Sequence, residues 1–175
     1  MEKAELKKSG KCLTFRVGRE EYGVEILKVR EIVALQEITE VPMTTSHIRG
    51  VINLRGKIIP VADMRHKLRL PGVDRTRDNC IVIVMVKGVQ GESLVGLQVD
   101  AMNEVFGMEE ATLEPIPQLG NGKALEFIQC LARVRGRVVI LLDIDQVVQA
   151  EELEGLEELG KFTSSMDKEK SPLPG

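Results

Sequence analysis

The stretch GVINLRGKIIPVADMR, residues 50–65, places an arginine and a glycine between two runs of branched aliphatic residues. Residues 51–54 and 58–61 have the length and composition of two short buried strands. Arg55 and Gly56 then fall at the tip of a hairpin, where glycine adopts positive φ without steric cost. The pattern predicts a tight β-hairpin whose turn requires the glycine but not the arginine.

The composition favours strands filled with aliphatic side chains. The chain has 175 residues and is 43% hydrophobic, with twenty valines, thirteen isoleucines, one tyrosine and no tryptophan. This length indicates one domain, or two very small ones that share a core. The net charge of −3 provides no general attraction for phosphate backbones.

Several features indicate a cytoplasmic protein that is not inserted into a membrane. The longest apolar runs, residues 81–86 and 138–142, are too short to span a bilayer. Residues 1–11 are charged and lack the apolar segment of a signal peptide, so they are expected to form a mobile arm. Three widely spaced cysteines without a CxxC pair are expected to be reduced, buried thiols. They are Cys12, Cys80 and Cys130.

Further strands and short helices follow from local patterns. Strands are expected over residues 12–17, 22–26, 78–86 and 94–99, and a strand–turn–strand unit over residues 134–142. A short helical turn is expected over residues 44–49 and a short helix over residues 123–129. Residues 151–175 have the composition of an acidic helical extension followed by a disordered tail.

The chain contains an internal repeat. At an offset of 73 residues, Glu31 aligns with Glu104 and Pro42 with Pro115, while at an offset of 80 the RGKII of residues 55–59 aligns with RGRVV of residues 135–139. Asp63 aligns with Asp143 at the same offset. Two copies of a small all-β unit explain the repeat, with halves at residues 12–65 and 78–148. Because neither half is long enough for a large core, the halves are expected to pack tightly as small barrels.

The sequence contains no pattern that indicates catalysis or metal binding. It lacks GxxxxGK[ST], GxGxxG, HExxH and GxSxG, and its two histidines have no second ligand at metal spacing. No enzyme activity, cofactor or metal is therefore expected. A barrel that binds single-stranded nucleic acid remains an alternative, although four Phe and one Tyr offer few stacking platforms. The five Lys and Arg residues within residues 65–77 are expected to lie in a solvated loop, and the paired acids Glu20 and Glu21 in a solvated turn.

Two runs, EEYGVEILKVREI at residues 20–32 and the opening stretch, resemble the CheW family of bacterial chemotaxis coupling proteins. The resemblance extends over residues 12–150 and implies two intertwined five-stranded β-barrels. It also implies an adaptor, monomeric in isolation, that joins the regulatory domain of the histidine kinase CheA to the cytoplasmic tips of chemoreceptors. A CheW-like scaffold of a non-flagellar chemosensory pathway is the nearest alternative.

The resemblance also implies candidate contact residues. The receptor-facing candidates are Val29, Glu31, Gly50, Val51, Asn53, Leu54 and Arg55. The aliphatic residues suggested for the kinase contact, which are expected to be exposed near the end of the first barrel, are Ile32, Leu35 and Ile38. The repeat qualifies the first set, because Arg55 has a counterpart in Arg135 whereas Asn53 is replaced by Arg133. An arginine at the hairpin tip is therefore not sufficient to define a receptor site.

Overall fold

The structure is a computed structural model that describes residues 10–41, 48–74, 76–88, 91–117 and 126–148. The expected acidic extension and tail at residues 151–175, and residues 1–9 of the expected arm, lie outside these residues. Lys11, which was assigned to the arm, begins the first strand.

Within the described residues, the first half of the chain contains five strands and the second half six. The first five are β1 (Lys11–Val17), β2 (Glu20–Glu25), β3 (Val29–Ala34), β4 (Ile48–Leu54) and β5 (Lys57–Asp63). The others are β6 (Cys80–Gly88), β7 (Gly91–Val99), β8 (Ala101–Gly107), β9 (Thr112–Glu114), β10 (Ile128–Val134) and β11 (Arg137–Leu142). The short helices are α1 (Met64–Lys67), α2 (Ile144–Val147) and the 3-10 turns η2 (Ile26–Lys28) and η3 (Met108–Glu110).

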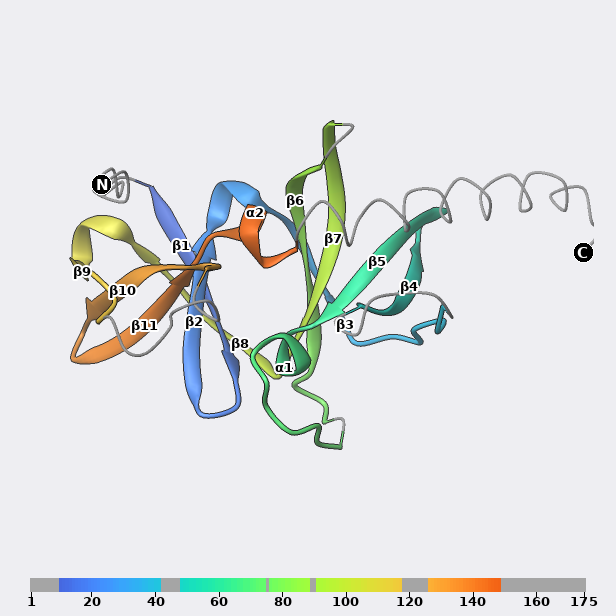
Figure 1. The fold of residues 1–175 in the computed structure, drawn as a ribbon, viewed down its shortest axis with the longest axis horizontal. Coiled ribbons are helices and arrows are strands. Elements are labelled where there is room, and N and C mark those ends of the chain that lie inside the picture. The colour runs from blue at the N-terminus through green and yellow to red at the C-terminus, as the bar shows by residue number, and fades with distance from the viewer. Residues whose placement is uncertain (1–9, 42–47, 75, 89–90, 118–125, 149–175) are drawn as a thin grey trace, which may run out of the picture.

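The two halves exchange strands, which confirms the intertwined all-β architecture (Figure 1). The sheet of the first barrel has the order β3-β6-β7-β5-β4, and the sheet of the second barrel has the order β8-β1-β2-β11-β10-β9. Each sheet contains one parallel pair, β5 with β7 and β11 with β2, and each of these pairs joins a strand of one half to a strand of the other. Neither half can therefore complete a sheet alone.

The two sheets are copies of one design. With offsets of 73 and 80 residues, β3 corresponds to β8, β4 to β10 and β5 to β11, and α1 corresponds to α2 residue for residue. Asp63 and Asp143 cap these helices by accepting hydrogen bonds from Arg65 N at 3.0 Å and Asp145 N at 3.1 Å. The sheet of the second barrel has one additional strand, β9. Its counterpart in the first barrel is an isolated β-bridge between Thr39 and Val51.

The described residues form three apolar cores. The largest contains twenty buried residues and draws on both sheets, including Phe15, Val82 and Leu97. Two smaller cores lie within the individual barrels, one around Ile52 and Ile81 and the other around Phe106 and Cys130. Because the shared core is the largest, the pair of barrels forms one folding unit.

Two local predictions were wrong. Arg49 belongs to β4 and not to a helical turn, and residues 42–47 lie outside the described residues. Ile128 and Gln129, expected to end a helix, begin β10. From Ile128 onward, buried residues alternate with less buried ones, and this period of two favours a strand. The sequence prediction also missed β9 entirely.

Candidate functional site

The Arg-Gly turns have the same backbone geometry in both barrels. Arg55 and Gly56 have φ values of 51° and 87°, and Arg135 and Gly136 have values of 49° and 78°. Positive φ at both central residues is the geometry of a two-residue hairpin loop that matches strand twist. An arginine in the left-handed region costs about 1 kcal/mol relative to glycine, so a compensating contact is expected at both tips.

Each arginine makes that contact with the equivalent glutamate. Arg55 forms an ion pair with Glu31 of β3, and Arg135 Nη1 lies 2.8 Å from Glu104 Oε1 of β8. Since β3 and β4 are the two outer strands of their sheet, the pair with Glu31 joins its opposite edges. The arginine of each tip therefore helps to close its barrel, whatever else it does.

The two tips differ in how fully their arginines are paired. The Arg135 guanidinium also lies 2.7 Å from Glu110, and the neighbouring Arg133 donates to both oxygens of Glu114 at 2.7 and 3.3 Å. The side chain of Arg55 is 71% exposed and forms an ion pair with Glu31. Of the two tips, the first therefore has the more exposed arginine, with fewer of its donors paired within the described residues.

The remaining receptor candidates shape this tip or lie beneath it. Asn53 is exposed, and its Oδ1 accepts a hydrogen bond from Gly56 N at 2.9 Å, which stabilises the turn. Leu54 is half-buried against the first-barrel core, and Val29 is half-buried against the shared core. Gly50 is buried where a Cβ would overlap the Thr39 carbonyl, and Val51 exchanges backbone hydrogen bonds with Thr39.

The three kinase candidates do not share one environment. Ile32 is exposed on β3, with 42% of its surface accessible. Leu35 and Ile38 were expected to be exposed but are half-buried against the first-barrel core. The repeat places Val105 at the position equivalent to Ile32, and it is also 42% exposed.

Sequence reasoning missed a charged network on the second barrel. Glu21 of β2 is buried and accepts hydrogen bonds from Arg137 Nε at 2.6 Å and Asn103 Nδ2 at 2.6 Å, and Arg137 also pairs with Glu104. Burial alone raises the pKa of Glu21, but hydrogen bonds from Arg137, Thr14 and Asn103 outweigh it and leave the pKa below its usual value of 4.5. The sequence favoured a solvated turn at this position because the partners come from distant strands.

We expect Glu21→Gln to lower the free energy of unfolding by about 1–2 kcal/mol at pH 7. The lowered pKa means that this stabilisation is present above pH 4.5 and is lost as the pH falls through the folded-state value. Urea unfolding of both proteins between pH 7 and pH 3.5 measures the difference. A destabilisation that stays constant over this range would show that ionised Glu21 is not the source of stability.

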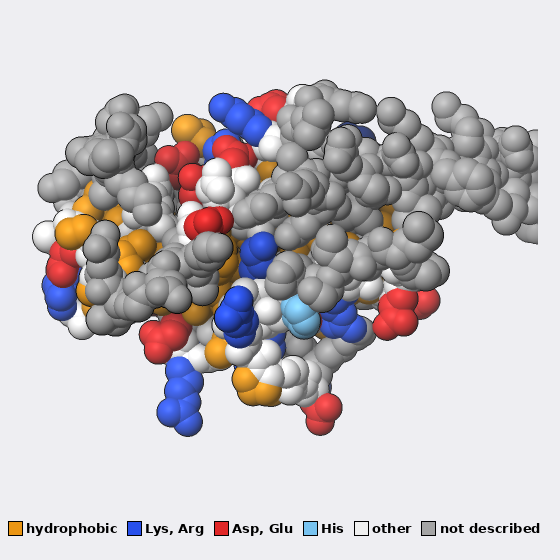
Figure 2. Space-filling view, in the orientation of Figure 1, with side chains coloured by type: hydrophobic (Ala, Val, Ile, Leu, Met, Phe, Trp, Pro, Cys, Tyr) orange, Lys and Arg blue, Asp and Glu red, His pale blue; other side chains and the backbone are white. Residues whose placement is uncertain are grey.

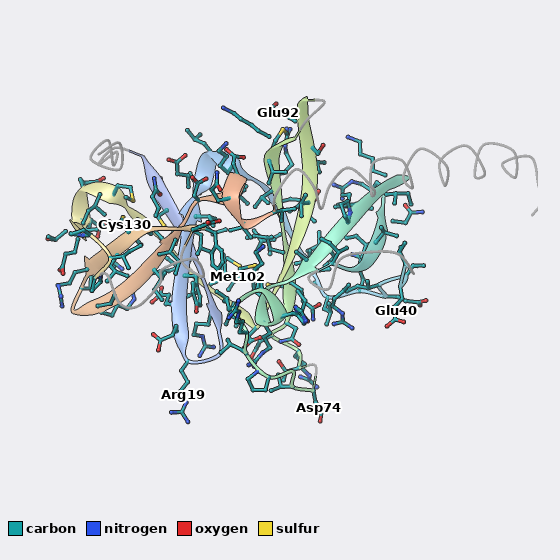
Figure 3. All side chains as sticks on the ribbon, viewed as in Figure 1. Arg19, Glu40, Asp74, Glu92, Met102 and Cys130 are labelled. Atoms are coloured by element: carbon teal, nitrogen blue, oxygen red, sulfur yellow. The ribbon has the colours of Figure 1, made fainter. Side chains whose placement is uncertain are left out.

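All three cysteines are buried, as expected for reduced structural thiols. Cys12 and Cys130 lie in the second-barrel core, where Figure 3 labels Cys130 among the strands of that barrel. Burial, with a smaller contribution from Glu21, raises the pKa of the Cys12 thiol to about 12. The thiolate that reacts with electrophiles is therefore almost absent at neutral pH.

We expect Cys12 to remain unmodified when the native protein is incubated with iodoacetamide at pH 7.5, and to react fully in 8 M urea. Mass spectrometry of tryptic peptides measures both states. Rapid modification of Cys12 before unfolding would contradict its placement in the core.

The described residues contain no group of three or more His, Cys, Asp or Glu side chains arranged to hold a metal ion. Among the helices in this part of the chain, none is long and apolar enough to cross a membrane. The polar groups at the two barrel tips are engaged in structural pairing, with Arg55 the most accessible of the paired arginines.

A rigid pair of β-barrels with an open charged tip defines a docking scaffold, a class of protein that acts by holding other proteins together. The CheW-like domain family model matches residues 11–152, and the chain belongs to the CheW-like family. It is accordingly a chemotaxis adaptor.

Individual relatives agree with this assignment. The chemotaxis protein CheW of Klebsiella aerogenes is 35% identical over 149 residues, which cover 85% of this chain and 87% of the relative. The protein FrzA of Myxococcus xanthus is 29% identical over 137 residues, covering 77% and 82% respectively. The crystal structure of the scaffolding protein TtCheW from Thermoanaerobacter tengcongensis superposes with a TM-score of 0.72 at 32% identity, covering 82% of this chain and 97% of that chain.

Proposed function

We propose that this chain couples the cytoplasmic tips of chemoreceptors to the regulatory domain of a CheA-type histidine kinase, without catalysis or a cofactor. The observation that supports a receptor site at the first barrel tip is the contrast between the two tips. Arg135 contacts two glutamates, whereas the largely exposed Arg55 is paired with Glu31. In a duplicated fold, the tip whose arginine is more exposed and less fully paired is the better candidate for a partner.

The receptor contact combines a polar and an apolar part. Glu31, Asn53 and Arg55 form the polar part, which we call the first-tip patch. A helical hairpin that lays an apolar stripe on the protein would contact the half-buried Val29 and Val51, while Arg55 donates hydrogen bonds at the edge. Gly50 and Leu54 support the patch from below and are not assigned a direct contact.

Ile32 is our candidate for the kinase contact. It is an exposed isoleucine on the edge strand β3, beside the half-buried Leu35 and Ile38 that hold this edge against the core. Edge strands and exposed aliphatic side chains are typical docking features. Because Glu31 and Ile32 are neighbours in a strand, their side chains point to opposite sides, which keeps the receptor and kinase contacts apart.

We expect Ile32→Glu to weaken binding to the kinase regulatory domain about tenfold or more and to leave receptor-tip binding unchanged. Val105→Glu is the matched control, because the repeat gives it the same strand position and the same 42% exposure. Isothermal titration calorimetry with each partner measures both variants. Equal losses in both variants, or no loss in Ile32→Glu, would remove Ile32 from the kinase contact.

The second candidate is a CheW-like scaffold of a non-flagellar chemosensory pathway, which is the nearest alternative that the resemblance implies. The fold and the first-tip patch are the same under either proposal, so the identity of the receptor and kinase decides between them. A pull-down with this chain as bait, a purified receptor-tip fragment and a kinase regulatory domain tests the proposed function. Capture of neither partner, or salt-sensitive binding of a single-stranded oligonucleotide instead, would overturn it.

A further inference from the structure

Two ion pairs, which we call the clamps, join the two halves of the chain. Arg65, the second residue of α1, donates to Asp100 through hydrogen bonds of 2.9 and 2.6 Å. Lys28 Nζ lies 3.1 Å from Oδ2 of Asp145, the second residue of α2. Lys28 and Asp100 directly precede β3 and β8, the strands at which the chain passes from one sheet to the other. Figure 1 shows α1 and α2 between the two barrels.

The clamps occupy equivalent places in the repeat. The second residues of α1 and α2 are aligned at the offset of 80 residues, and the strands that follow Lys28 and Asp100 are aligned at the offset of 73. The parallel strand pairs also share one register, because Val61 lies opposite Gly96 in the first barrel and the two equivalent residues lie opposite each other in the second. The backbone pairing is therefore the same at both junctions and does not distinguish one half from the other.

The charges of the two clamps are reversed. The helix position carries Arg65 in the first half and Asp145 in the second. The position before the strand carries Lys28 in the first half and Asp100 in the second. Both clamp residues of the first half are thus positive and both of the second half are negative. On the face drawn in Figure 2, acidic and basic side chains are intermixed, so this separation by sign is not a general property of the surface in that view.

A second copy of a duplicated chain offers each half an alternative partner. Exchange of identical elements between copies is a low-cost route to dimers, and misassembly is a characteristic failure of repeat proteins. If two first halves paired, Arg65 of each would face Lys28 of the other, and two second halves would place Asp145 opposite Asp100. The clamp side chains are only 18–29% exposed, so these like charges would meet where water and salt screen them incompletely.

A third ion pair between the halves lacks this property. Glu21 of β2 pairs with Arg137 of β11, and the residue equivalent to Arg137 in the first half is Lys57. Two first halves would therefore satisfy Glu21 with Lys57 of the other copy, and this contact does not oppose their pairing. Discrimination by charge depends on the clamps.

We propose that the reversed polarity of the two clamps directs each half to pair with an unlike half and opposes dimers in which like halves pair. The clamps attract when a first half meets a second half, and they repel in both kinds of like pairing. Like charges placed opposite each other suppress wrong partners in this way. The clamps do not oppose an exchange of unlike halves between two copies, because that arrangement retains both ion pairs.

The test reverses the clamps one at a time and then together in the full-length protein. One twofold variant combines Arg65→Asp with Asp100→Arg, and the other combines Lys28→Asp with Asp145→Lys. Each keeps both native clamps attractive and the net charge unchanged, but it gives each half one positive and one negative clamp residue, so that like halves attract as well. The fourfold variant carries all these substitutions and restores halves whose clamp residues have a single sign.

The proteins are unfolded in 8 M urea, refolded by dilution at low salt and analysed by size-exclusion chromatography with light scattering. We expect the wild type and the fourfold variant to be mainly monomeric. Both twofold variants should contain at least about fivefold more dimer, because repulsion at every clamp contact between like halves is replaced by attraction. Dimers that exchange unlike halves contribute equally to all the proteins, since the native clamps attract in each of them.

The fourfold variant also controls for loss of stability. Asp100 accepts a hydrogen bond of 2.8 Å from Gly18 N, and Asp145 accepts one of 2.9 Å from Lys87 N, so reversal removes these acceptors. The fourfold variant loses both, and dimers caused by instability would be most abundant in it. A fourfold variant as dimeric as the twofold variants, or twofold variants no more dimeric than the wild type, would overturn the proposal.

A gentler variant combines Arg65→Gln with Asp100→Asn. The asparagine keeps an oxygen that accepts from Gly18 N, and the neutral side chains remove the opposition of like charges without reversing either clamp. We expect its dimer content after refolding to lie between those of the wild type and the twofold variants. A wild-type dimer content in this variant, once thermal unfolding shows that it is folded, would contradict the proposed role of the clamps.

Discussion

Replacing Arg55→Glu should reduce receptor-dependent activation of the kinase at least tenfold while the protein remains folded. The substitution removes the exposed donors of the first-tip patch and places a negative charge beside Glu31. Losing one partner of a charge-assisted contact in an interface costs about 2–5 kcal/mol, and about 1.4 kcal/mol already corresponds to a factor of ten. The measurement is kinase autophosphorylation in the presence of receptor and this chain.

Arg135→Glu is the matched control for this prediction. Arg135 has the same left-handed backbone conformation, precedes the same glycine and pairs with the equivalent glutamate, so reversal of its charge disturbs folding at least as much. We expect this variant to activate the kinase nearly normally once it is shown to be folded by thermal unfolding. Equal loss of activation in both variants would mean that the arginines act through barrel closure and not through a receptor contact.

Gly50→Ala should lower the free energy of unfolding by about 2–4 kcal/mol, a larger loss than that expected for Glu21→Gln. A Cβ at this position overlaps the backbone carbonyl of Thr39, which cannot yield in the way that a flexible side chain can. Thr39 and Val51 exchange backbone hydrogen bonds of 2.8 and 2.9 Å, and displacing Thr39 weakens both of them. Overpacking commonly costs about 1–3 kcal/mol, and each weakened hydrogen bond adds about 1 kcal/mol.

Urea unfolding measures this loss, with Gly72→Ala as the control. Gly72 is exposed, and a Cβ there would meet no atom within 4 Å, so its replacement should change stability by less than about 0.5 kcal/mol. If Gly50→Ala were as stable as the control but failed to bind receptor, Gly50 would belong to the contact surface itself. The structure instead favours a supporting role for this glycine.

The internal repeat made much of the fold accessible from sequence. The repeat aligns Glu31 with Glu104 and Arg55 with Arg135, and these residues form the two barrel-closing ion pairs. It also aligns Asp63 with Asp143, which cap the two equivalent helices. These contacts were predictable because a duplicated unit repeats the residues that its backbone geometry needs. Hairpins were found for the same reason, since their partners are adjacent in the chain.

The features that the sequence did not reveal depend on contacts between distant strands. The exchange of strands was implied by the family resemblance alone, because the parallel pairs β5–β7 and β11–β2 leave no local pattern. Glu21 was expected in a solvated turn because its hydrogen-bond partners, Arg137 and Asn103, are 116 and 82 residues away in the sequence. The openness of the first tip could not be predicted either, because it depends on where Glu110 and Glu114 lie around the second tip.

The short basic cluster shows how local composition can mislead. Five Lys and Arg residues within residues 65–77 indicated a solvated loop, yet Arg65 and Lys67 belong to α1 and Arg65 is fixed by Asp100. Asp100 also accepts a hydrogen bond of 2.8 Å from Gly18 N. This carboxylate therefore connects α1 of the first barrel to the β1–β2 turn of the second, an arrangement that only the folded chain displays.

Coupling is the central claim, and reconstitution tests it most directly. Kinase autophosphorylation is measured with receptor-containing membranes, a CheA-type kinase and this chain, added together and in each pair. We predict a large rise in kinase activity only when all three components are present, and its loss when Arg55→Glu replaces the wild-type chain. A rise of the same size with receptor and kinase alone, or no rise with all three although each partner binds, would contradict the account.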